Sequence, residues 1–484
     1  MHPAPSRRSL ILGAGAAVCA TSLGNVSAAG APAPSGASAA ADPSVTPLGS
    51  TLLDRTALYF VSYDGLVNNN AFQKNGLLTV GGHQYAVWYA GDRNATVARR
   101  ALGDDTWETV TVGHTLTIND SHNVICAGVS ADGRLHLVMD AHSSGYFYVK
   151  SVPGLVSSPD DHAWTGDAFG PVQRSLDGVT LTSTMTYPQF VVSPSGALQL
   201  SYRTGVSGNG QAALAEYDAG TDRWTNLGAW SSATGTYTTG YGSSGARNLY
   251  LHGLDYGRDG TLHVFGTWRE QSTAVTCGAN LTNHDTVYVR STDRGRTWTN
   301  AAGSVVGRTG SGTLVGVSSP GLIADPLSPD HALMNQESQA VDSAGRPHAL
   351  ISYVPGRFGQ CVTDYVAGRI AYARPFHVWR NASGTWQKTE VPFAMNSSQR
   401  SQLLLDASDN AYVVMPYGRI AAASAASGWS DWTMLFDDDL NAFGEIVPDY
   451  HRVAVDGVLS FLYQESSSGT TPSPLHVIDF QLPT

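Results

Sequence analysis

The chain contains little charge and little cysteine. Asp, Glu, Lys and Arg together make up 14% of its 484 residues, cysteine occurs four times, and the formal net charge is −11. Because binding to nucleic acid requires clustered Lys and Arg, this balance argues against a nucleic-acid-binding protein. After residue 28 no apolar segment is long enough to span a bilayer, so we expect no membrane association.

Several catalytic signatures are also missing. The sequence has no Walker P-loop, no H-E-x-x-H, no strand-borne G-x-S-x-G and no pair of C-x-x-C motifs. These absences weigh against phosphoryl transfer and serine hydrolysis. What the chain does contain is abundant glycine, 52 residues, and 9% aromatic residues. This composition favours many short strands joined by tight turns, and it excludes disorder, coiled coil and collagen.

The N-terminus has the pattern of an export signal. Ser6-Arg7-Arg8-Ser9 precedes an apolar stretch at residues 10–23, and Val26-Ser27-Ala28 offers a small-residue cleavage site. This pattern is typical of a twin-arginine signal peptide, and a spacer rich in Ala, Pro, Ser and Gly follows it. We therefore expect a signal at residues 1–28, a flexible linker at residues 29–50, a catalytic domain at residues 51–484, and secretion to the cell exterior.

One turn-and-strand pattern occurs seven times. A turn containing Asp, Ser, Asn or Gly leads into an alternating apolar strand, and several copies continue into a second hairpin that carries a Trp. Two hairpins make a four-stranded blade, and such repeats without helical periodicity indicate a β-propeller. We predict an all-β, seven-bladed propeller of four-stranded antiparallel blades, with turns at Gly82, Gly133, Gly196, Gly260, Gly345, Asn410 and Gly457.

The segment from Ser291 to Trp298 fits the Asp-box pattern S-x-D-x-G-x-T-W. We expect it to be structural, because its Asp and Gly close a hairpin turn and its Trp packs between blades. A strand at residues 57–61 and a strand at residues 475–478 can share a blade and so close the ring.

Three cysteines remain once Cys19 leaves with the signal. Cys126 lies in an apolar strand and is expected to be a buried small hydrophobe. Cys277 and Cys361 lie in polar loops, and the sequence leaves two alternatives open for them, a disulfide or ligation of a shared metal.

Four polar residues flank two consecutive predicted hairpins. His122 precedes one strand and His142 follows its return strand, so both imidazoles are expected at the same edge of a blade. Tyr187 and Arg203 take the corresponding positions in the next hairpin. All four side chains are therefore expected to meet at the mouth of the propeller. The alternative interpretation is that the two histidines are unrelated loop residues, that the tyrosine packs across strands, and that the arginine forms a surface ion pair.

These residue types suit the β-elimination of a 4-O-linked uronate. The C5 proton becomes acidic once the carboxylate is neutralised, a task for the guanidinium of Arg203 assisted by a histidine. Tyr187 can take this proton as a phenolate, if its cationic surroundings lower its pKa, and can then return a proton to O4. Hydrolysis would require a pair of carboxylates flanking the bond, and none is evident.

Together with three downstream segments, this set resembles the neuraminidase-repeat-like propeller polysaccharide lyases, which include ulvan lyases and rhamnosyl-glucuronate lyases acting on gum arabic. The segments are Tyr250-Leu251-His252-Gly253, Thr267-Trp268-Arg269-Glu270 and Asn283-His284-Asp285. The resemblance implies a lyase that cleaves the rhamnosyl-(1→4)-glucuronate linkage. It implies Tyr187 as base and acid, Arg203 and His122 as neutralising groups, and His142 as an orienting group. Substrate binding is expected from Asn123, Tyr250, His252 and Arg269.

The resemblance also implies no catalytic cofactor but a bound structural divalent metal, calcium or zinc. Candidate ligands, without an assigned site, are His284, Asp285, His331, His377 and Cys361. The expected partner is an anionic uronate-containing polysaccharide, either ulvan or an arabinogalactan, and the chain is expected to be a monomer. Two alternatives are a glycoside hydrolase, rhamnosidase-like or sialidase-like, on the same propeller, and a carbohydrate-binding propeller without catalysis.

Overall fold

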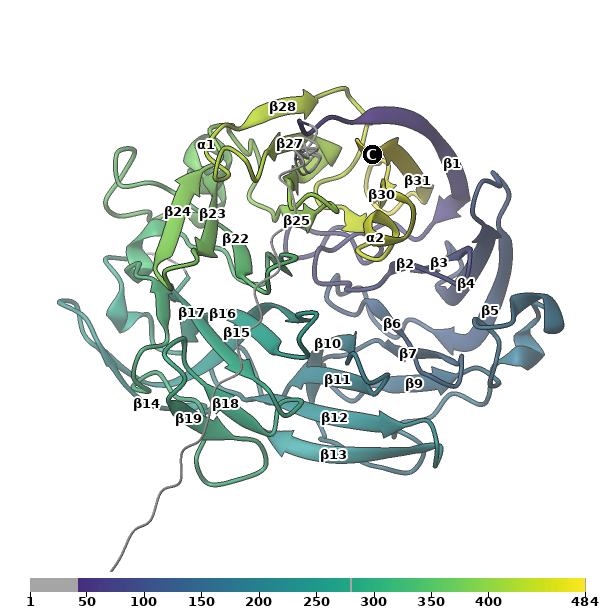
Figure 1. Ribbon diagram of the computed structural model, residues 1–484, viewed down its shortest axis with the longest axis horizontal. Helices are drawn as coiled ribbons and strands as arrows, with labels where there is room; N and C mark the ends of the chain where they lie inside the picture. The colour runs from purple at the N-terminus through teal and green to yellow at the C-terminus, as the bar shows by residue number, and fades with distance from the viewer. Residues whose placement is uncertain (1–41, 279–280, 484) are drawn as a thin grey trace, which may run out of the picture. The chain divides into compact units, whose positions relative to one another are not determined.

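Each of the seven repeat turns adjoins a strand of a different antiparallel sheet. The computed structural model describes residues 42–278 and 281–483, and within them the strands form seven sheets that follow one another around a ring (Figure 1). Apolar side chains fill the space between neighbouring sheets. One such cluster joins Val138 and Tyr148 of one sheet to Phe190 and Leu200 of the next. The chain is therefore an all-β propeller, as the sequence predicts.

The first three sheets contain strands from the N-terminal half of the ring. The first sheet consists of β2 (Leu77–Val80), β3 (His83–Tyr89), β4 (Asn94–Ala101) and β5 (Glu108–Thr115). The second consists of β6 (Ile125–Val129), β7 (Leu135–Met139) and β9 (Phe147–Lys150). The third consists of β8 (His142–Ser144), β10 (Met185–Val192), β11 (Leu198–Arg203), β12 (Ala212–Asp218) and β13 (Arg223–Ala229).

The remaining four sheets complete the ring. The fourth sheet consists of β14 (Thr234–Thr238), β15 (Ser243–Tyr256), β16 (Leu262–Glu270), β17 (Asn283–Ser291), β18 (Thr297–Thr299), β19 (Val305–Arg308) and β20 (Ile323–Asp325). The fifth consists of β21 (Ser338–Val341), β22 (Pro347–Tyr353), β23 (Arg374–Arg380) and β24 (Trp386–Glu390), and the sixth of β25 (Gln402–Leu405), β26 (Ala411–Val414), β27 (Ile420–Ala423) and β28 (Thr433–Phe436). The seventh consists of β1 (Thr46–Ala57), β29 (Val447–Pro448), β30 (Val458–Gln464) and β31 (Ser473–Gln481).

The expected count of seven four-stranded blades is wrong. Six sheets of the described residues have four or more strands and form six blades, whereas the sheet of β6, β7 and β9 has three. Beside β9, residues 169–173 take the place of a fourth strand but make only isolated bridges to Tyr148 and Ser151. Pro171 lies in this stretch and has no N–H to donate, so a continuous ladder cannot form there.

The two ends of the described chain share one sheet. β1 pairs with β31, with Asp54 opposite Leu475, so the ring is closed by a strand pair as expected. The N-terminal partner is β1 rather than residues 57–61. Because β1 begins at Thr46, the expected linker at residues 29–50 ends too late. The expected signal at residues 1–28 lies outside the described residues.

The Asp box has the structural role that the sequence predicts. The carboxylate of Asp293 accepts hydrogen bonds from the backbone of Thr297 and the hydroxyl of Ser291. Trp298 is fully buried and stacks on Trp230 with ring centroids 4.3 Å apart. The motif therefore fixes a hairpin and fills the core of its blade.

Helices are few and short. They are α1 (Tyr365–Tyr372), α2 (Arg452–Asp456) and the 3-10 turns Pro159–Asp161, Gly166–Ala168, Thr273–Val275, Pro329–His331 and Pro416–Gly418. Among the residues that the structure describes, none of these helices has the length and apolar character needed to cross a membrane. Cys277 and Cys361 form a disulfide, which decides between disulfide formation and metal ligation, and Cys126 is a buried free thiol.

Candidate active site

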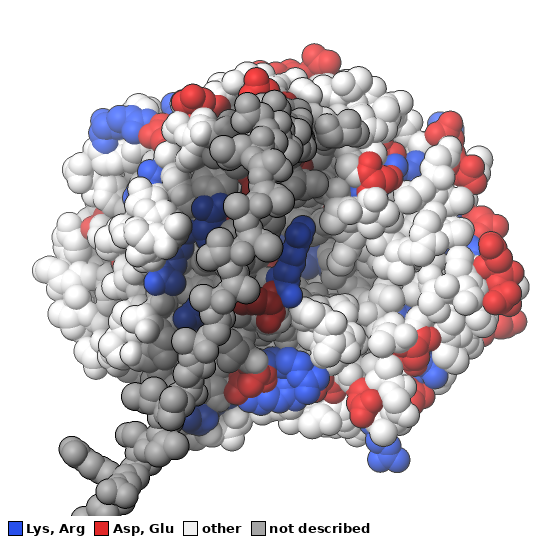
Figure 2. All heavy atoms as spheres, viewed as in Figure 1, with Lys and Arg blue, Asp and Glu red and all other residues white. Residues whose placement is uncertain are grey.

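A cavity of about 490 Å³ lies at one end of the innermost strands of the propeller. Five of the eight predicted site residues line it: His122, His142, Tyr187, Tyr250 and Arg269. They meet because the innermost strands of neighbouring sheets contact one another side by side, so that residues at corresponding strand ends converge. On the face shown in Figure 2, several Lys and Arg side chains lie around the centre, and most Asp and Glu side chains in view lie toward the rim.

Asp120 joins the two predicted histidines. Its two carboxylate oxygens lie 3.1 Å from Nδ1 of His122 and 2.6 Å from Nδ1 of His142, and the two rings are stacked 4.2 Å apart. Burial opposes ionisation of Asp120, but these contacts hold its pKa well below its usual range. Burial lowers the pKa of His122 to about 4, partly offset by the Asp120 carboxylate. The site thus holds a neutral imidazole against a carboxylate.

Tyr187 enters the cavity from an irregular point of β10. The pairing of β10 with β11 shifts register between Thr186 and Gln189, and Tyr187 has a φ of +55° immediately before Pro188. A bulky residue rarely adopts this left-handed backbone, which is found where a bulge redirects a side chain. Burial raises the pKa of the Tyr187 hydroxyl despite the nearby Arg203. The expectation of a lowered pKa is therefore wrong, and the residue is a phenol.

Arg203 does not line the cavity. It is buried behind Tyr187, with its guanidinium carbon 5.1 Å from the centre of the tyrosine ring. Its guanidinium donates to the hydroxyls of Tyr250 (2.9 Å), Ser143 (3.0 Å) and Thr186 (2.7 Å). Because β11 lies between β10 and β12 in its sheet, and Arg203 pairs with Thr186 of β10, its side chain reaches the site only from behind. Arg203 supports the tyrosines and does not face the cavity.

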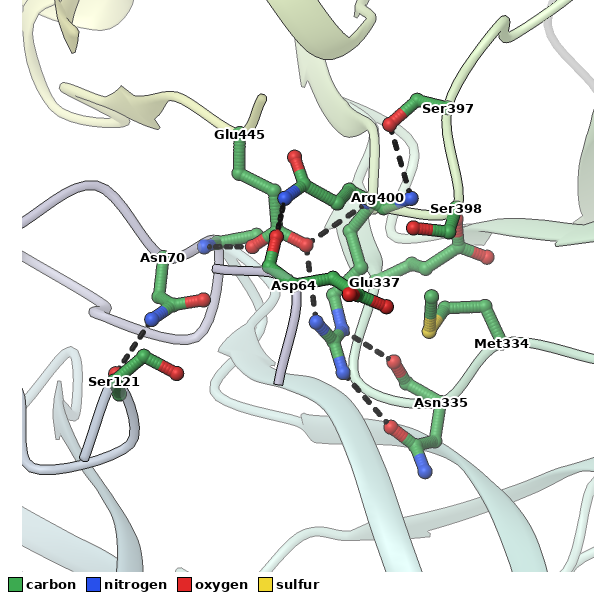
Figure 3. Close-up of polar contacts among 12 residues, drawn as sticks. Asp64, Asn70, Ser121, Met334, Asn335, Glu337, Ser397, Ser398, Arg400 and Glu445 are labelled. Carbon is green, nitrogen blue, oxygen red and sulfur yellow. Dashed lines mark hydrogen bonds and ion pairs between the residues drawn. The ribbon is translucent and has the colours of Figure 1, made fainter. Parts of the chain in front are cut away.

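Two other arginines face the cavity. Arg269, in β16, has no hydrogen bond or ion pair to its guanidinium among the described residues, and it lies near enough to Tyr187 to affect its ionisation. Arg400 was not predicted; its Nη1 contacts Glu445 at 3.0 Å, and its Nε and Nη2 donate to Asn335 at 2.8 and 3.1 Å (Figure 3). Arg269 is therefore available to an anionic ligand, whereas Arg400 is held in place.

Sequence reasoning placed two residues at the site that lie elsewhere. Asn123 is buried and does not line the cavity; it follows His122 at the end of a turn, where its backbone N–H donates to the carbonyl oxygen of Asp120. His252 lines a second cavity of about 480 Å³ near the other end of the innermost strands. Its Nε2 contacts Thr267, and its Nδ1 accepts the backbone N–H of Glu337.

The candidate metal ligands do not gather into a site. His284 contacts Asp285 and Glu270, His331 contacts a backbone carbonyl, His377 contacts His348, and Cys361 is in the disulfide. These five residues do not fit a bound ion, because no three of them bring ligand atoms within 4.8 Å of one another in the described part of the chain, although Nδ1 of His377 has no hydrogen-bond partner there. Within residues 42–278 and 281–483, Asp120, His122 and His142 form the one group of three metal-binding side chains with ligand atoms within 4.8 Å.

Comparison with known proteins agrees with the fold. The model of a family described as "BNR repeat-containing family member" matches residues 83–394. The crystal structure of polysaccharide lyase Uly1 superposes with a TM-score of 0.68 at 17% identity, over 90% of this chain and 99% of that one. A PL25 ulvan lyase bound to -[GlcA(1-4)Rha3S]- superposes with a TM-score of 0.64 at 11% identity, over 88% of this chain and 94% of that one. No curated protein matches the chain in sequence.

Proposed function

The chain belongs to the BNR repeat-containing family, and we propose that it is a polysaccharide lyase that cleaves the rhamnosyl-(1→4)-glucuronate linkage by β-elimination. One observation carries the proposal: a guanidinium without a partner, a phenol and a carboxylate-bound imidazole pair line one cavity. β-Elimination needs these three functions, namely neutralisation of the uronate, an acid and a base. The fold shared with an ulvan lyase that holds a GlcA(1-4)Rha3S chain supports the same substrate class.

Arg269 is the group that receives the uronate carboxylate. A guanidinium binds a carboxylate through two parallel N–H···O contacts, and this pairing withdraws charge from the neighbouring C5 carbon. Arg400, fixed by Glu445 and Asn335, adds positive potential to the same wall. Together they favour an anionic sugar in a chain whose net charge is −11.

His122 is the group that removes the C5 proton. Its imidazole is neutral near pH 7, because burial lowers its pKa to about 4. The bound uronate brings a negative charge, which raises the proton affinity of this ring, and the ionised Asp120 stabilises the imidazolium that forms. His142 shares Asp120 and stacks on His122, so it fixes the plane of the base.

Tyr187 is the group that protonates the leaving oxygen. As C5–H is lost to His122, the C4–O4 bond breaks, a C4–C5 double bond forms, and the Tyr187 hydroxyl gives its proton to O4. Arg203 lies against the ring and stabilises the resulting phenolate. Transfer of the proton from His122 to Tyr187, whose ring centroids are 5.8 Å apart, restores both groups.

Hydrolysis on the same scaffold has weaker support. The carboxylates that line the cavity are Asp64 and Glu445. Glu445 accepts hydrogen bonds from Arg400 and from the backbone N–H of Ala71, so it is committed to the wall and is a poor general acid. A glycosidase needs two carboxyl groups that are free to act on the bond.

The proposal is tested by ultraviolet absorbance during incubation with ulvan and, separately, with gum arabic. β-Elimination creates a conjugated unsaturated uronate, so absorbance is expected to grow on one of the polymers and thereby identify the substrate. Reducing sugar that rises without absorbance would mean a hydrolase. No signal of either kind, combined with retention on a polymer column, would mean a carbohydrate-binding propeller.

Export to an oxidising compartment is part of the proposal. The Arg7-Arg8 segment is typical of a twin-arginine signal. The disulfide between Cys277 and Cys361 supports a location outside the reducing cytoplasm. Mass spectrometry of the culture medium is expected to find the chain beginning near residue 29.

A further inference from the structure

A third cavity, which is lined by basic side chains, lies away from the candidate active site. It has a volume of about 330 Å³ and lies between the β14–β20 sheet and the β21–β24 sheet, which are neighbours in the ring (Figure 1). Its walls include three arginines, Arg290, Arg346 and Arg380, together with His263 and Tyr288. None of these residues takes part in the proposed reaction.

Strand register explains why these side chains meet. His263 of β16 lies directly opposite Arg290 of β17, so the two side chains project from the same face of their sheet. Tyr288 is two residues before Arg290 on the same strand and shares that face. Arg380 ends β23, and Arg346 lies in the turn before β22, so the neighbouring sheet supplies the other wall.

The positive charge of this cavity is only partly compensated. Arg346 pairs with Asp342 at 2.5 Å. Neither Arg290 nor Arg380 has a carboxylate partner among the described residues, and the one hydrogen bond of the Arg380 side chain goes to the backbone oxygen of Gly384. Arg290 and Arg380 thus place two guanidinium groups without carboxylate partners in one cavity of an acidic chain. Because each can donate charge-assisted hydrogen bonds, the cavity is suited to an anion.

A buried imidazole adds an independent observation. His263 is 3% exposed, its Nδ1 lies 2.7 Å from the Tyr288 hydroxyl, and its Nε2 has no hydrogen-bond partner among the described residues. Burial raises the pKa of Tyr288, so its hydroxyl keeps a proton that it can donate to Nδ1. With Tyr288 as the donor to Nδ1, the Nε2 of His263 carries a hydrogen, and a buried donor without a partner is costly unless a ligand accepts from it.

We infer that Arg290, Arg380 and His263 form a second anion site, which takes an oxyanion group, carboxylate or sulfate, of an acidic polysaccharide. The site would hold a polymer at a distance from the reacting linkage. It involves none of the residues of the proposed reaction, so it can be tested whether or not that reaction is the right one.

The first test uses sodium sulfate as the probe, in calorimetric titrations at constant ionic strength. All proteins carry Arg269→Ala, so that the main cavity contributes no free guanidinium. Relative to this background, Arg290→Ala and Arg380→Ala are each expected to weaken sulfate binding about tenfold, since each removes charge-assisted hydrogen bonds. Arg223→Ala, which removes an exposed arginine from the β12–β13 hairpin, is the matched control and should change nothing. Equal affinity in all four proteins would overturn the inference.

The second test identifies the source of the oxyanion. Gel electrophoresis through glucuronate-containing polysaccharide is run in a Tyr187→Phe background, so that the polymer is not consumed. Arg290→Ala should be retarded less than the background, and Arg290→Lys, which keeps the charge, should recover part of the retardation. Loss of sulfate binding with unchanged retardation would reject a polysaccharide as the ligand. Thermal unfolding of each variant shows whether the fold is intact.

Discussion

The imidazole rings of His122 and His142 are stacked 12° from parallel, and the Nδ1 atoms of both face the carboxylate of Asp120. In addition to burial, His142 lowers the pKa of His122, because a second positive charge at a centroid distance of 4.2 Å would repel the first. The Asp120 charge balances the proton that His122 takes up. The arrangement therefore suits a base that takes one proton in each turnover.

Replacement of Asp120 tests this arrangement. Asp120→Asn is expected to lower kcat about 100-fold, because the imidazolium formed at His122 loses its stabilising charge. The Asp120 carboxylate raises the pKa of His122, so its removal should also move the acidic limb of the rate profile to lower pH. The measurement is turnover from about pH 3 to 9, so that a limb that moves below the His122 pKa of about 4 is still seen. Asp160→Asn, at an exposed position, is the control, and an unmoved acidic limb would contradict the role.

The phenol of Tyr187 is tested by removing one oxygen. Tyr187→Phe is expected to lower kcat about 1000-fold, the middle of the range for a lost acid catalyst, and to change KM little. The comparison variant is Tyr241→Phe, whose ring is 59% exposed and lies outside the cavity. Retention of more than a tenth of the activity would show that another group protonates O4.

Arg269 and Arg203 are expected to differ in which kinetic constant they control. Arg269→Ala should raise KM about 10-fold to 100-fold and also lower kcat, because the guanidinium that it removes binds the carboxylate in the ground state and makes the C5 proton acidic. Arg203→Gln should lower kcat and leave KM nearly unchanged, because Arg203 acts through the ring of Tyr187. Steady-state kinetics on one polymer gives both constants. Equal effects on KM would contradict the separation of roles.

Turn chemistry made much of the fold predictable. Each repeat turn contains a residue suited to a hairpin, as at Gly82 and Gly260, which adopt φ values of +78° and +82°. Six of the turns join strands of six separate sheets, as predicted, whereas Gly457 ends α2 immediately before β30 of the seventh sheet. The fourth strand beside β9 could not be predicted, because its loss depends on where Pro171 falls relative to a neighbouring strand.

The site was predictable where a polar residue directly flanks an innermost strand. His122 before β6 and Tyr187 in β10 follow that rule. Arg400 follows it too, just before β25, and the same rule would have found it. His252 was misplaced because it lies beyond Tyr250 along β15, at a register shift between Leu251 and Gly253, and it lines the cavity of about 480 Å³ instead. Asp120 was missed because its contact with His142 joins loops 22 positions apart.

Glu337 predicts a pH dependence of stability. Burial raises its pKa to about 7 from 4.5, although Arg369 opposes the shift. As pH rises from 4.5 to 7, the unfolded chain ionises while the folded chain keeps its proton, so this group costs stability above pH 7 and nothing below 4.5. Between pH 4.5 and pH 8, the free energy of unfolding of Glu337→Gln should therefore rise by on the order of 3 kcal/mol relative to that of the wild type. Urea unfolding at both pH values measures the gain, with Glu108→Gln, at an exposed position, as control. An unchanged pH slope would contradict it.

The disulfide is expected to stabilise one wall of the cavity as well as the fold. Cys277 and Cys361 lie 84 positions apart, and they link the loops that carry Leu281 and Tyr365, both of which line the cavity. Asp330 supports the same junction, because it accepts hydrogen bonds from the backbone of Cys277 and of Val362.

Loss of this cross-link predicts two effects. The double variant Cys277→Ser, Cys361→Ser should lose about 2–4 kcal/mol of stability, the range for a long closed loop. KM should rise while kcat changes little, since the disulfide supports the segments of Leu281 and Tyr365 in the cavity wall and none of the proton-transfer groups. Urea unfolding and steady-state kinetics measure the two effects, and wild type under reducing conditions should behave like the double variant. Unchanged stability with unchanged KM would show that Asp330 alone holds the wall.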